Sequence, residues 1–218
     1  MKYSVSEENY IKSIYHLQAV HQQVTATMLA ESVQTKAASV TDMLKKLQLK
    51  KLVHYKPYKS FTLTESGNKT ALGIIRKHRL WEFFLVDKLQ FEWNEVHDIA
   101  EELEHISSKE LINRLDAFLG NPAFDPHGDP IPNSKGKMAE VKQKNLIELP
   151  CRKIHVVSLI KDQSAAMLDL LKHYNISIGT KLKINRRFEF DGSVEIKIDK
   201  IPDAILSKQV AQNIYCTV

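Results

Sequence analysis

The first 65 residues show an order of patterned segments that few folds share. Three segments, at 6–20, 25–33 and 37–52, carry apolar residues at helical spacing. We expect Ser6 to open the first helix, because two glutamates follow it directly. Two β-rich arms around a Lys-containing tip follow at 53–64 and indicate a hairpin. Three helices followed by a hairpin is the order of a winged helix-turn-helix, so we assign residues 1–65 to such a domain.

The third of these segments predicts a helix that reads DNA. Small side chains on its outward face let the backbone approach the major groove, and lysines beside them contact phosphates. The candidate DNA-binding residues, with two lysines of the hairpin tip included, are Lys36, Ala37, Ser39, Thr41, Lys45, Lys56 and Lys59. A small helical domain with a hairpin and no role on DNA is the alternative interpretation.

Residues 66–132 predict a second, helical domain. The segment 66–89 is apolar on more than one face, which favours packing on a second subunit and therefore a homodimer. Shorter helices are expected at 95–106 and 109–120, and a proline-rich irregular loop at 121–133.

The strongest chemical signal is a set of histidines and glutamates in this helical domain. On a continuous helix, four of them at 97–105 would share one face, and the preceding helix repeats the four-residue spacing. Imidazoles and carboxylates flanked by apolar residues favour a divalent transition metal over a solvated charged face. The residues are His97, Glu101, Glu104 and His105, preceded by His78 and Glu82.

The remaining chain changes in composition. Residues 133–149 are polar and Lys-rich and are expected to be a linker. Residues 150–218 show a strand, an amphipathic helix and a hairpin turning at Asp191–Gly192, which predicts a small SH3-like β-barrel. The predicted fold class is therefore mainly α with a small β domain. It combines a winged helix-turn-helix, a helical dimerisation and metal-binding domain, and a C-terminal SH3-like β-barrel.

Composition excludes several other classes. The chain of 218 residues has no apolar run long enough for a membrane span, and its start lacks the apolar core of a signal peptide. Cys151 and Cys216 have neither disulfide-framework nor zinc-finger spacing. The sequence also lacks an HExxH motif and a Gly-rich phosphate loop, so we expect no enzyme and no small-molecule substrate. A cytoplasmic protein is the expectation.

Several segments, in order, resemble the diphtheria toxin repressor family, which includes the manganese transport regulators. The matching segments are SEENYIKSIYHL, FTLTESGNKTA, RKHRLWEFFL, EVHDIAEELEH and DPHGDPIP, and the final SH3-like domain also matches. The resemblance covers nearly the whole chain. It implies a homodimeric regulator that binds double-stranded operator DNA when loaded with Fe(II) or Mn(II) and represses metal uptake genes.

The resemblance also implies two metal sites. The primary site would be built from Asn9, Glu101, Glu104 and His105. A neighbouring site would use His78, Glu82 and His97, helped by Asp125 or His127 of the loop and by Asp162 or Gln163 of the SH3-like domain.

Departures from the family pattern bear on the metal. Position 101 is Glu, as in the manganese regulators, where the iron regulators carry Cys. Asn9 replaces an acidic or Met ligand, and Lys12 stands where some manganese members have an acid, which argues against a two-metal cluster at residue 12. Hard oxygens with an imidazole favour Mn(II), with Fe(II) as the alternative and Zn(II) or Co(II) as substitutes in vitro. The rival hypothesis is a metal-independent winged-helix regulator whose histidines and glutamates form only salt bridges.

Overall fold

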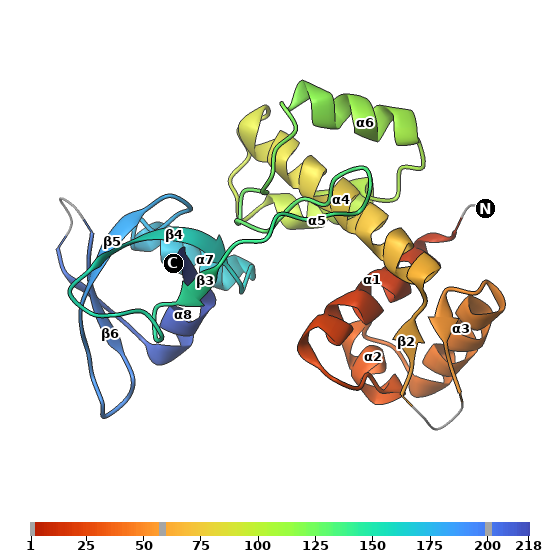
Figure 1. Cartoon of the computed structure of the whole chain (residues 1–218), viewed down its shortest axis with the longest axis horizontal. Helices are drawn as coiled ribbons and strands as arrows, with labels where there is room; N and C mark the ends of the chain where they lie inside the picture. Colours follow the sequence, from red (N-terminus) through yellow and green to blue (C-terminus); the bar gives the residue numbers. More distant parts are fainter. Residues whose placement is uncertain (1–2, 57–59, 199–201) are drawn as a thin grey trace. The chain divides into compact units, whose positions relative to one another are not determined.

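The computed structural model of the chain describes residues 3–56, 60–198 and 202–218 (Figure 1). Contacts divide it into two compact units, and helices α4, α5 and, by its last residue, α6 contribute to both. The first unit contains Met1–His78, Glu101–Ala117 and Pro132–Lys137, and the second contains Arg79–Ala100, Phe118–Ile131 and Met138–Val218.

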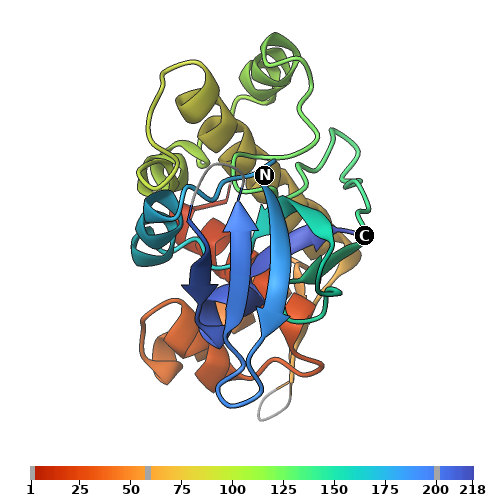
Figure 2. The same ribbon diagram turned by 90° about the vertical axis from the view of Figure 1, so that its left-hand side faces the viewer.

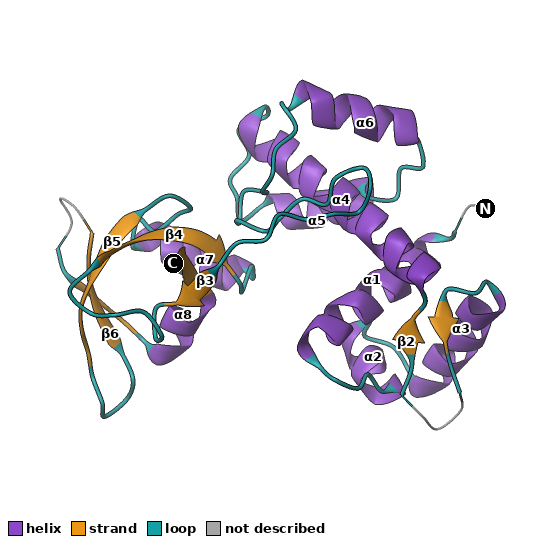
Figure 3. Cartoon of the chain, in the orientation of Figure 1, coloured by secondary structure: helices purple, strands orange, loops and turns teal. Residues whose placement is uncertain are grey.

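The first unit begins with the predicted winged helix-turn-helix (Figure 3). Strands β1 and β2 pair antiparallel, with Val53 opposite Leu63. The tip between them includes residues 57–59, so predicted Lys59 lies outside the described residues, while Lys56 is exposed. The elements are α1 (Val5–Val20), α2 (Ala26–Ser32), α3 (Ala37–Leu49), β1 (Val53–His54) and β2 (Thr62–Leu63).

The start of α1 differs from the prediction. Ser4, not Ser6, is the N-cap, because its side chain accepts a hydrogen bond from the Glu7 backbone while the Glu7 side chain accepts one from the Ser4 backbone. This reciprocal capping box needs a glutamate three residues after the cap, which Ser6 lacks because Asn9 stands there. The expectation for Ser6 was wrong by two residues.

The core of this unit explains how α3 is placed. Ile11, Ile14, Leu44 and Leu47 are fully buried, so the outward face of α3 is left for solvent. The helix ends at Leu49 rather than at residue 52, because Lys51 takes a left-handed conformation with φ of 59°.

Glu7 connects α1 to α3 through buried charge. It is 1% exposed, and its Oε1 lies 2.6 Å from Lys50 Nζ and 3.2 Å from Lys46 Nζ. Burial alone would raise the pKa of Glu7, but hydrogen bonds from Lys50, the Ser4 backbone and Lys46 lower it to about 2. This stabilisation is therefore fully present above the usual pKa of 4.5 and is lost as the pH falls toward about 2.

Replacing Glu7 by glutamine is expected to lower the free energy of unfolding by about 1–3 kcal/mol at pH 7, because two lysines lose a buried partner. Urea denaturation followed by circular dichroism measures the change. The exposed Glu31 of α2 is the control, with an expected change of Glu31→Gln within about 0.5 kcal/mol. Equal stabilities of the two variants would contradict the role of Glu7.

Three further helices follow: α4 (Glu65–Asp87), α5 (Val96–Leu103) and α6 (Lys109–Phe118). Helix α5 is shorter than predicted, and Glu104 and His105 lie in the turn after it. The expectation that His97, Glu101, Glu104 and His105 share one helical face was therefore wrong at its C-terminal end. The turn instead places Glu104 in a fully buried position.

The second unit contains a six-stranded antiparallel sheet, seen in the blue and teal strands of Figure 2. The strand order is β3-β8-β4-β5-β6-β7. The hairpin β5–β6 turns through Asp191 and Gly192 as predicted, and Gly192 has φ of +72°. The elements are β3 (Gln143–Asn145), β4 (Ile154–Ile160), α7 (Ala165–His173), β5 (Lys181–Arg187), β6 (Val194–Ile198), β7 (Ala204–Leu206), α8 (Lys208–Asn213) and β8 (Ile214–Thr217).

Strand β3 lies inside the stretch 133–149 that the sequence predicts as a linker. It pairs with β8, and Leu146 and Leu149 just after it are buried in the core of this unit. The three residues of this short edge strand are all polar and none is buried, so the sequence carries no strand pattern there. Among the described residues, no helix is both long and apolar enough to cross a membrane.

Candidate metal centre

Three buried residues of the second unit form a compact group of metal-ligand type. Glu82 comes from α4, and Asp125 and His127 come from the loop after α6. One ligand atom from each lies within 4.8 Å of the others. These three residues are called the Glu82 group below.

His127 is oriented with one nitrogen available. Its Nε2 donates a hydrogen bond to the Trp93 carbonyl at 2.9 Å, so Nδ1 carries the lone pair of the neutral ring. This Nδ1 is buried and has no hydrogen-bond partner among the described residues. The Glu82 Oε2 atom lies 3.8 Å from it. A ring held through one nitrogen with the other facing carboxylates is the usual arrangement of a metal-binding histidine.

Asp125 holds the loop together and adds negative charge. Its Oδ1 accepts hydrogen bonds from the backbones of His127 and Asp129, both at 2.9 Å, and its Oδ2 lies 3.5 Å from Arg79 Nε. Burial, with the charges of Asp129 and Glu82, raises the pKa of Asp125 to about 7. Burial and the two neighbouring carboxylates therefore outweigh the arginine at this position.

The electrostatics of the group favour a bound cation. Burial alone would lower the pKa of His127, but the neighbouring carboxylates of Glu82 and Asp125 raise it. The raised pKa values of Asp125 and His127 both mean that the group attracts protons, whose place a divalent ion takes when it binds. Buried carboxylate oxygens with one unpartnered imidazole nitrogen fit a divalent metal.

His97 adds a contact to the same carboxylate. Its Nδ1 lies 3.4 Å from Glu82 Oε1, and its side chain is 48% exposed. The neighbouring site that the resemblance implies combines His97 with His78 and Glu82, and His97 contacts Glu82 here. An exposed imidazole at the edge of a buried group is placed to contribute a further ligand.

The C-terminal domain holds the loop of the Glu82 group in place. The Ile160 backbone donates to the His127 carbonyl at 2.9 Å, and Gln163 Nε2 donates to Asp129 Oδ2 at 2.5 Å. Asp162 instead accepts a hydrogen bond from the Ser164 backbone at the start of α7. Of the two candidates from this domain, Gln163 therefore contacts the loop and Asp162 caps a turn.

Gly128 lets the loop approach β4 closely. It has φ of +90°, and a Cβ atom there would lie 2.1 Å from the Ser158 carbonyl oxygen. Replacing it by alanine is expected to lower the free energy of unfolding by about 2–3 kcal/mol more than Gly179→Ala. Gly179 is a matched control, because it has φ of +86° but open space around it. Equal losses in urea denaturation would contradict the close packing at Gly128.

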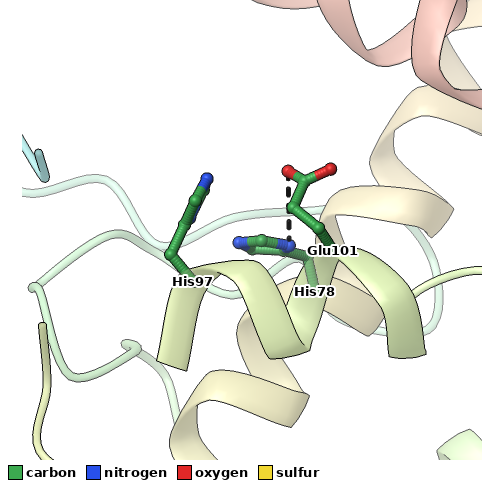
Figure 4. Close-up of side chains that lie close together, drawn as sticks. All are labelled: His78, His97 and Glu101. Carbon is green, nitrogen blue, oxygen red and sulfur yellow. Dashed lines mark ion pairs between the residues drawn. The ribbon is translucent and has the colours of Figure 1, made fainter. Parts of the chain in front are cut away.

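The first unit contains the other predicted ligands. Glu104 is 0% exposed, and its Oε2 lies 2.7 Å from His78 Nδ1 and 2.8 Å from Lys12 Nζ. Burial alone would raise the pKa of Glu104, but the hydrogen bond from His78 and the charge of Lys12 lower it. Figure 4 shows the ion pair between His78 Nδ1 and Glu101 at 3.9 Å, with His97 one turn earlier on α5. The resemblance assigned His78 to the neighbouring site, whereas here it contacts both glutamates.

His105 and Asn9 also face these carboxylates. His105 Nδ1 lies 2.6 Å from Glu8 Oε2, which leaves Nε2 directed at Glu104 Oε1, 3.8 Å away. The Asn9 Oδ1 atom is buried without a hydrogen-bond partner among the described residues. Asn9, Glu101, Glu104 and His105, called the Glu104 group below, are thus four donors of the type that the sequence predicts. Lys12 lies between two of them, so the group as it stands does not fit a divalent ion.

Three contributors to these groups were missed from the sequence. From the sequence, Lys12 marks only the absence of an acidic metal ligand, and Glu8 and Asp129 are not among the predicted ligands. Glu8 stands four residues before Lys12, on the turn of α1 that faces His105, and Asp129 follows Asp125 at a turn spacing. Local spacing therefore signals Asp129, but the long-range pairing of Lys12 and Glu8 appears only in the fold.

The candidate DNA-binding residues of the third helix lie at or near the surface of the first unit. Lys36, Ala37, Ser39 and Lys45 are exposed on α3 or at its start. Thr41 is half-buried and donates its hydroxyl to the Ala37 carbonyl at 3.1 Å. Small side chains at the N-terminal end of α3 leave its backbone accessible.

Comparisons with known families cover most of the chain. Residues 2–61 match the N-terminal DNA-binding domain of iron-dependent repressors, and residues 64–133 match their metal-binding and dimerisation domain. Residues 144–218 match the FeoA domain.

Two solved structures have a similar fold over nearly the whole chain. A manganese-dependent transcriptional repressor in complex with manganese is 36% identical, with a TM-score of 0.86 over 97% of this chain and 99% of that one. The manganese regulator SloR is 30% identical, with a TM-score of 0.75 over 96% of this chain and 97% of its own.

Curated relatives match over a shorter range. The iron-dependent repressor IdeR of Mycobacterium tuberculosis is 33% identical over 125 residues, which is 57% of this chain and 54% of the relative. The chain therefore spans about half the length of the curated relatives that it matches first.

Proposed function

The chain belongs to the family of iron-dependent repressors, which includes the diphtheria toxin repressors, and we propose that it represses transcription in response to Mn(II). As a homodimer, it binds operator DNA when metal is bound and releases it when metal is scarce. The genes that it represses encode proteins for metal uptake. Its place of action is the cytoplasm, where the DNA is.

The Glu82 group carries this proposal. Two carboxylates and a histidine are buried together, and His127 Nδ1 has no hydrogen-bond partner among the described residues. Such a group is costly to fold without a cation, since buried charges need compensation. Glu82, Asp125 and His127 would hold the ion, with His97 at the edge. The bound ion supplies the positive charge that the group lacks.

Mn(II) is the preferred ion, and Fe(II) is the alternative. The donors are hard oxygens and imidazoles without a thiolate, and both cysteines lie elsewhere, in the C-terminal domain. Solved relatives named as manganese regulators support the preference, while curated relatives named as iron-dependent repressors support the alternative. Zn(II) and Co(II) are expected to substitute in vitro, because nitrogen and oxygen sites bind them at least as tightly.

The DNA interface of the proposal is the exposed face of α3 with Lys56 of the wing. Lysines there contact phosphates, which gives affinity that falls with salt, and the small side chains let α3 enter the major groove. Leu111 and Phe118 of α6 are 42% and 65% exposed, which supports a second subunit covering this helix.

Metal and DNA binding are coupled through the fold. Glu82 lies on α4, the continuous helix that begins two residues after the wing strand β2 ends. A metal ion that binds one conformation of this helix and loop more tightly than the other shifts the population toward the conformation that it prefers. The size of the shift is set by the difference between the two affinities.

A metal titration tests the proposal. The full chain is added to fluorescently labelled DNA from upstream of its own gene neighbourhood, and Mn(II), Fe(II) and Zn(II) are titrated separately. We expect Mn(II) to raise the operator affinity at least about 10-fold, a coupling in the usual range. Unchanged affinity with every metal, and after chelation by EDTA, would establish the metal-independent winged-helix regulator instead.

A further inference from the structure

Lys12 lies where a cation would bind in the Glu104 group. Its Nζ is 2.5 Å from Glu101 Oε1 and 2.8 Å from Glu104 Oε2. The Lys12 side chain is 13% exposed, and Glu104 is completely buried. The ammonium therefore bridges α1 to the end of α5 through two charge-assisted hydrogen bonds.

The other two potential metal ligands of the group, Asn9 and His105, face the carboxylates but make no hydrogen bond with Lys12. The Asn9 Oδ1 atom is buried without a hydrogen-bond partner among the described residues. His105 is held by Glu8 through Nδ1 and directs Nε2 at Glu104 Oε1, 3.8 Å away. The Lys12 ammonium has only hydrogen-bond donors, so it occupies lone pairs of the carboxylates and offers none of its own to a metal ion.

A divalent ion and the Lys12 ammonium cannot share these carboxylates. The ion would need the same oxygen atoms at about 2.0–2.3 Å, well inside the distance that Lys12 now keeps. Two positive charges at such a separation in a buried place repel strongly. Metal binding at the Glu104 group would therefore require the lysine to leave.

We propose that Lys12 is a built-in cation that replaces a metal ion at the Glu104 group. The chain then binds one divalent ion, at the Glu82 group, and the connection between α1 and α5 does not depend on metal. This inference rests on the proposed function, because it assumes that the chain responds to Mn(II). Removing the ammonium would open the complete set of Asn9, Glu101, Glu104 and His105 to a second ion.

The first experiment counts bound Mn(II) per full-length chain by electron paramagnetic resonance of the free ion. We expect one ion for wild type and two for Lys12→Met, which removes the charge but keeps most of the side-chain stem. Lys12→Arg retains a cation and should keep one ion. Lys183→Met, at an exposed position of β5, controls for the loss of one positive charge and should also keep one.

The second experiment holds even if Lys12→Met does not fold. In the wild-type background, the double variant with Glu82→Gln and His127→Ala should bind no Mn(II) at concentrations that saturate wild type. An ion that remains bound to this double variant would show that the Glu104 group binds metal despite Lys12 and would overturn the inference.

Two ions in wild type, or an equal number in wild type and folded Lys12→Met, would overturn it as well. These failures are distinct from failure of the proposed function, which would appear as operator binding by wild type that does not respond to Mn(II).

Discussion

Replacing His127 by alanine is expected to weaken Mn(II) binding by at least about 100-fold and to remove the response of operator binding to Mn(II). Loss of a residue that only orients a metal ligand costs about 10–100-fold in affinity, so loss of the ligand itself should reach or exceed the upper end. His127 is fully buried and directs an unpartnered Nδ1 into the Glu82 group. Mn(II) affinity is measured by isothermal titration calorimetry, and operator binding by fluorescence anisotropy.

His155 provides a matched control for this variant. It is also buried, at 8% exposure, and its Nε2 donates to the Pro150 carbonyl at 3.0 Å within the C-terminal domain. His155→Ala should lower stability to a similar degree but leave the Mn(II) affinity within about 2-fold of wild type, since it removes packing and not a ligand. Unchanged Mn(II) affinity in folded His127→Ala would exclude His127 from the metal site.

Replacing Glu104 by glutamine is expected to lower the free energy of unfolding by about 3 kcal/mol at pH 7. Breaking a buried ion pair by removing one partner costs about 3–5 kcal/mol, and the lower end applies because Lys12 keeps its contact with Glu101. Urea denaturation of wild type and variant in EDTA gives the difference without any contribution of metal.

The same variant has a defined dependence on pH. The pKa of Glu104 lies below its usual value of 4.5 in the folded chain, so the stabilisation is present above pH 4.5 and is lost as the pH falls through the folded pKa. The difference between Glu104→Gln and wild type should therefore shrink as the pH falls below 4.5. Glu102→Gln is the control, because Glu102 is exposed near the end of α5, two residues before Glu104, and a loss there as large as at Glu104 would contradict the account.

The order of elements was predictable because each segment carries its own local pattern. The apolar spacing of residues 6–49 and the β-rich arms after them are sufficient for a winged helix-turn-helix. Ends of elements were less predictable, because they depend on single interactions. The capping box moved the start of α1 to Ser4, and the left-handed Lys51 ended α3 early.

Local spacing predicts the residue types of the candidate site, whereas the grouping of Glu82 with the loop residues follows only from the family resemblance. Spacing on one helix suggested that His97, Glu101, Glu104 and His105 act together, yet α5 ends at Leu103 and the chain turns Glu104 inward. Loop residues Asp125 and His127 meet Glu82 across a gap of more than forty positions in the sequence, and no periodic pattern reports such a contact.

Lys12 shows most clearly what a sequence pattern leaves open. Its position marks the absence of an acidic ligand, but the same position allows its ammonium to reach two carboxylates, one on α5 and one in the turn after it. Whether a basic residue removes a site or fills it depends on the length of its side chain and on the burial of its partners. The lysine supplies the length, and the fold buries Glu104.

Anomalous X-ray scattering at the manganese absorption edge is the most direct test of where metal binds. Crystals of the full chain grown with Mn(II) should show one strong anomalous peak per chain, among Glu82, Asp125 and His127. No peak should appear between Glu101 and Glu104, where Lys12 Nζ lies. A peak between Glu101 and Glu104, with none beside His127, would contradict the account.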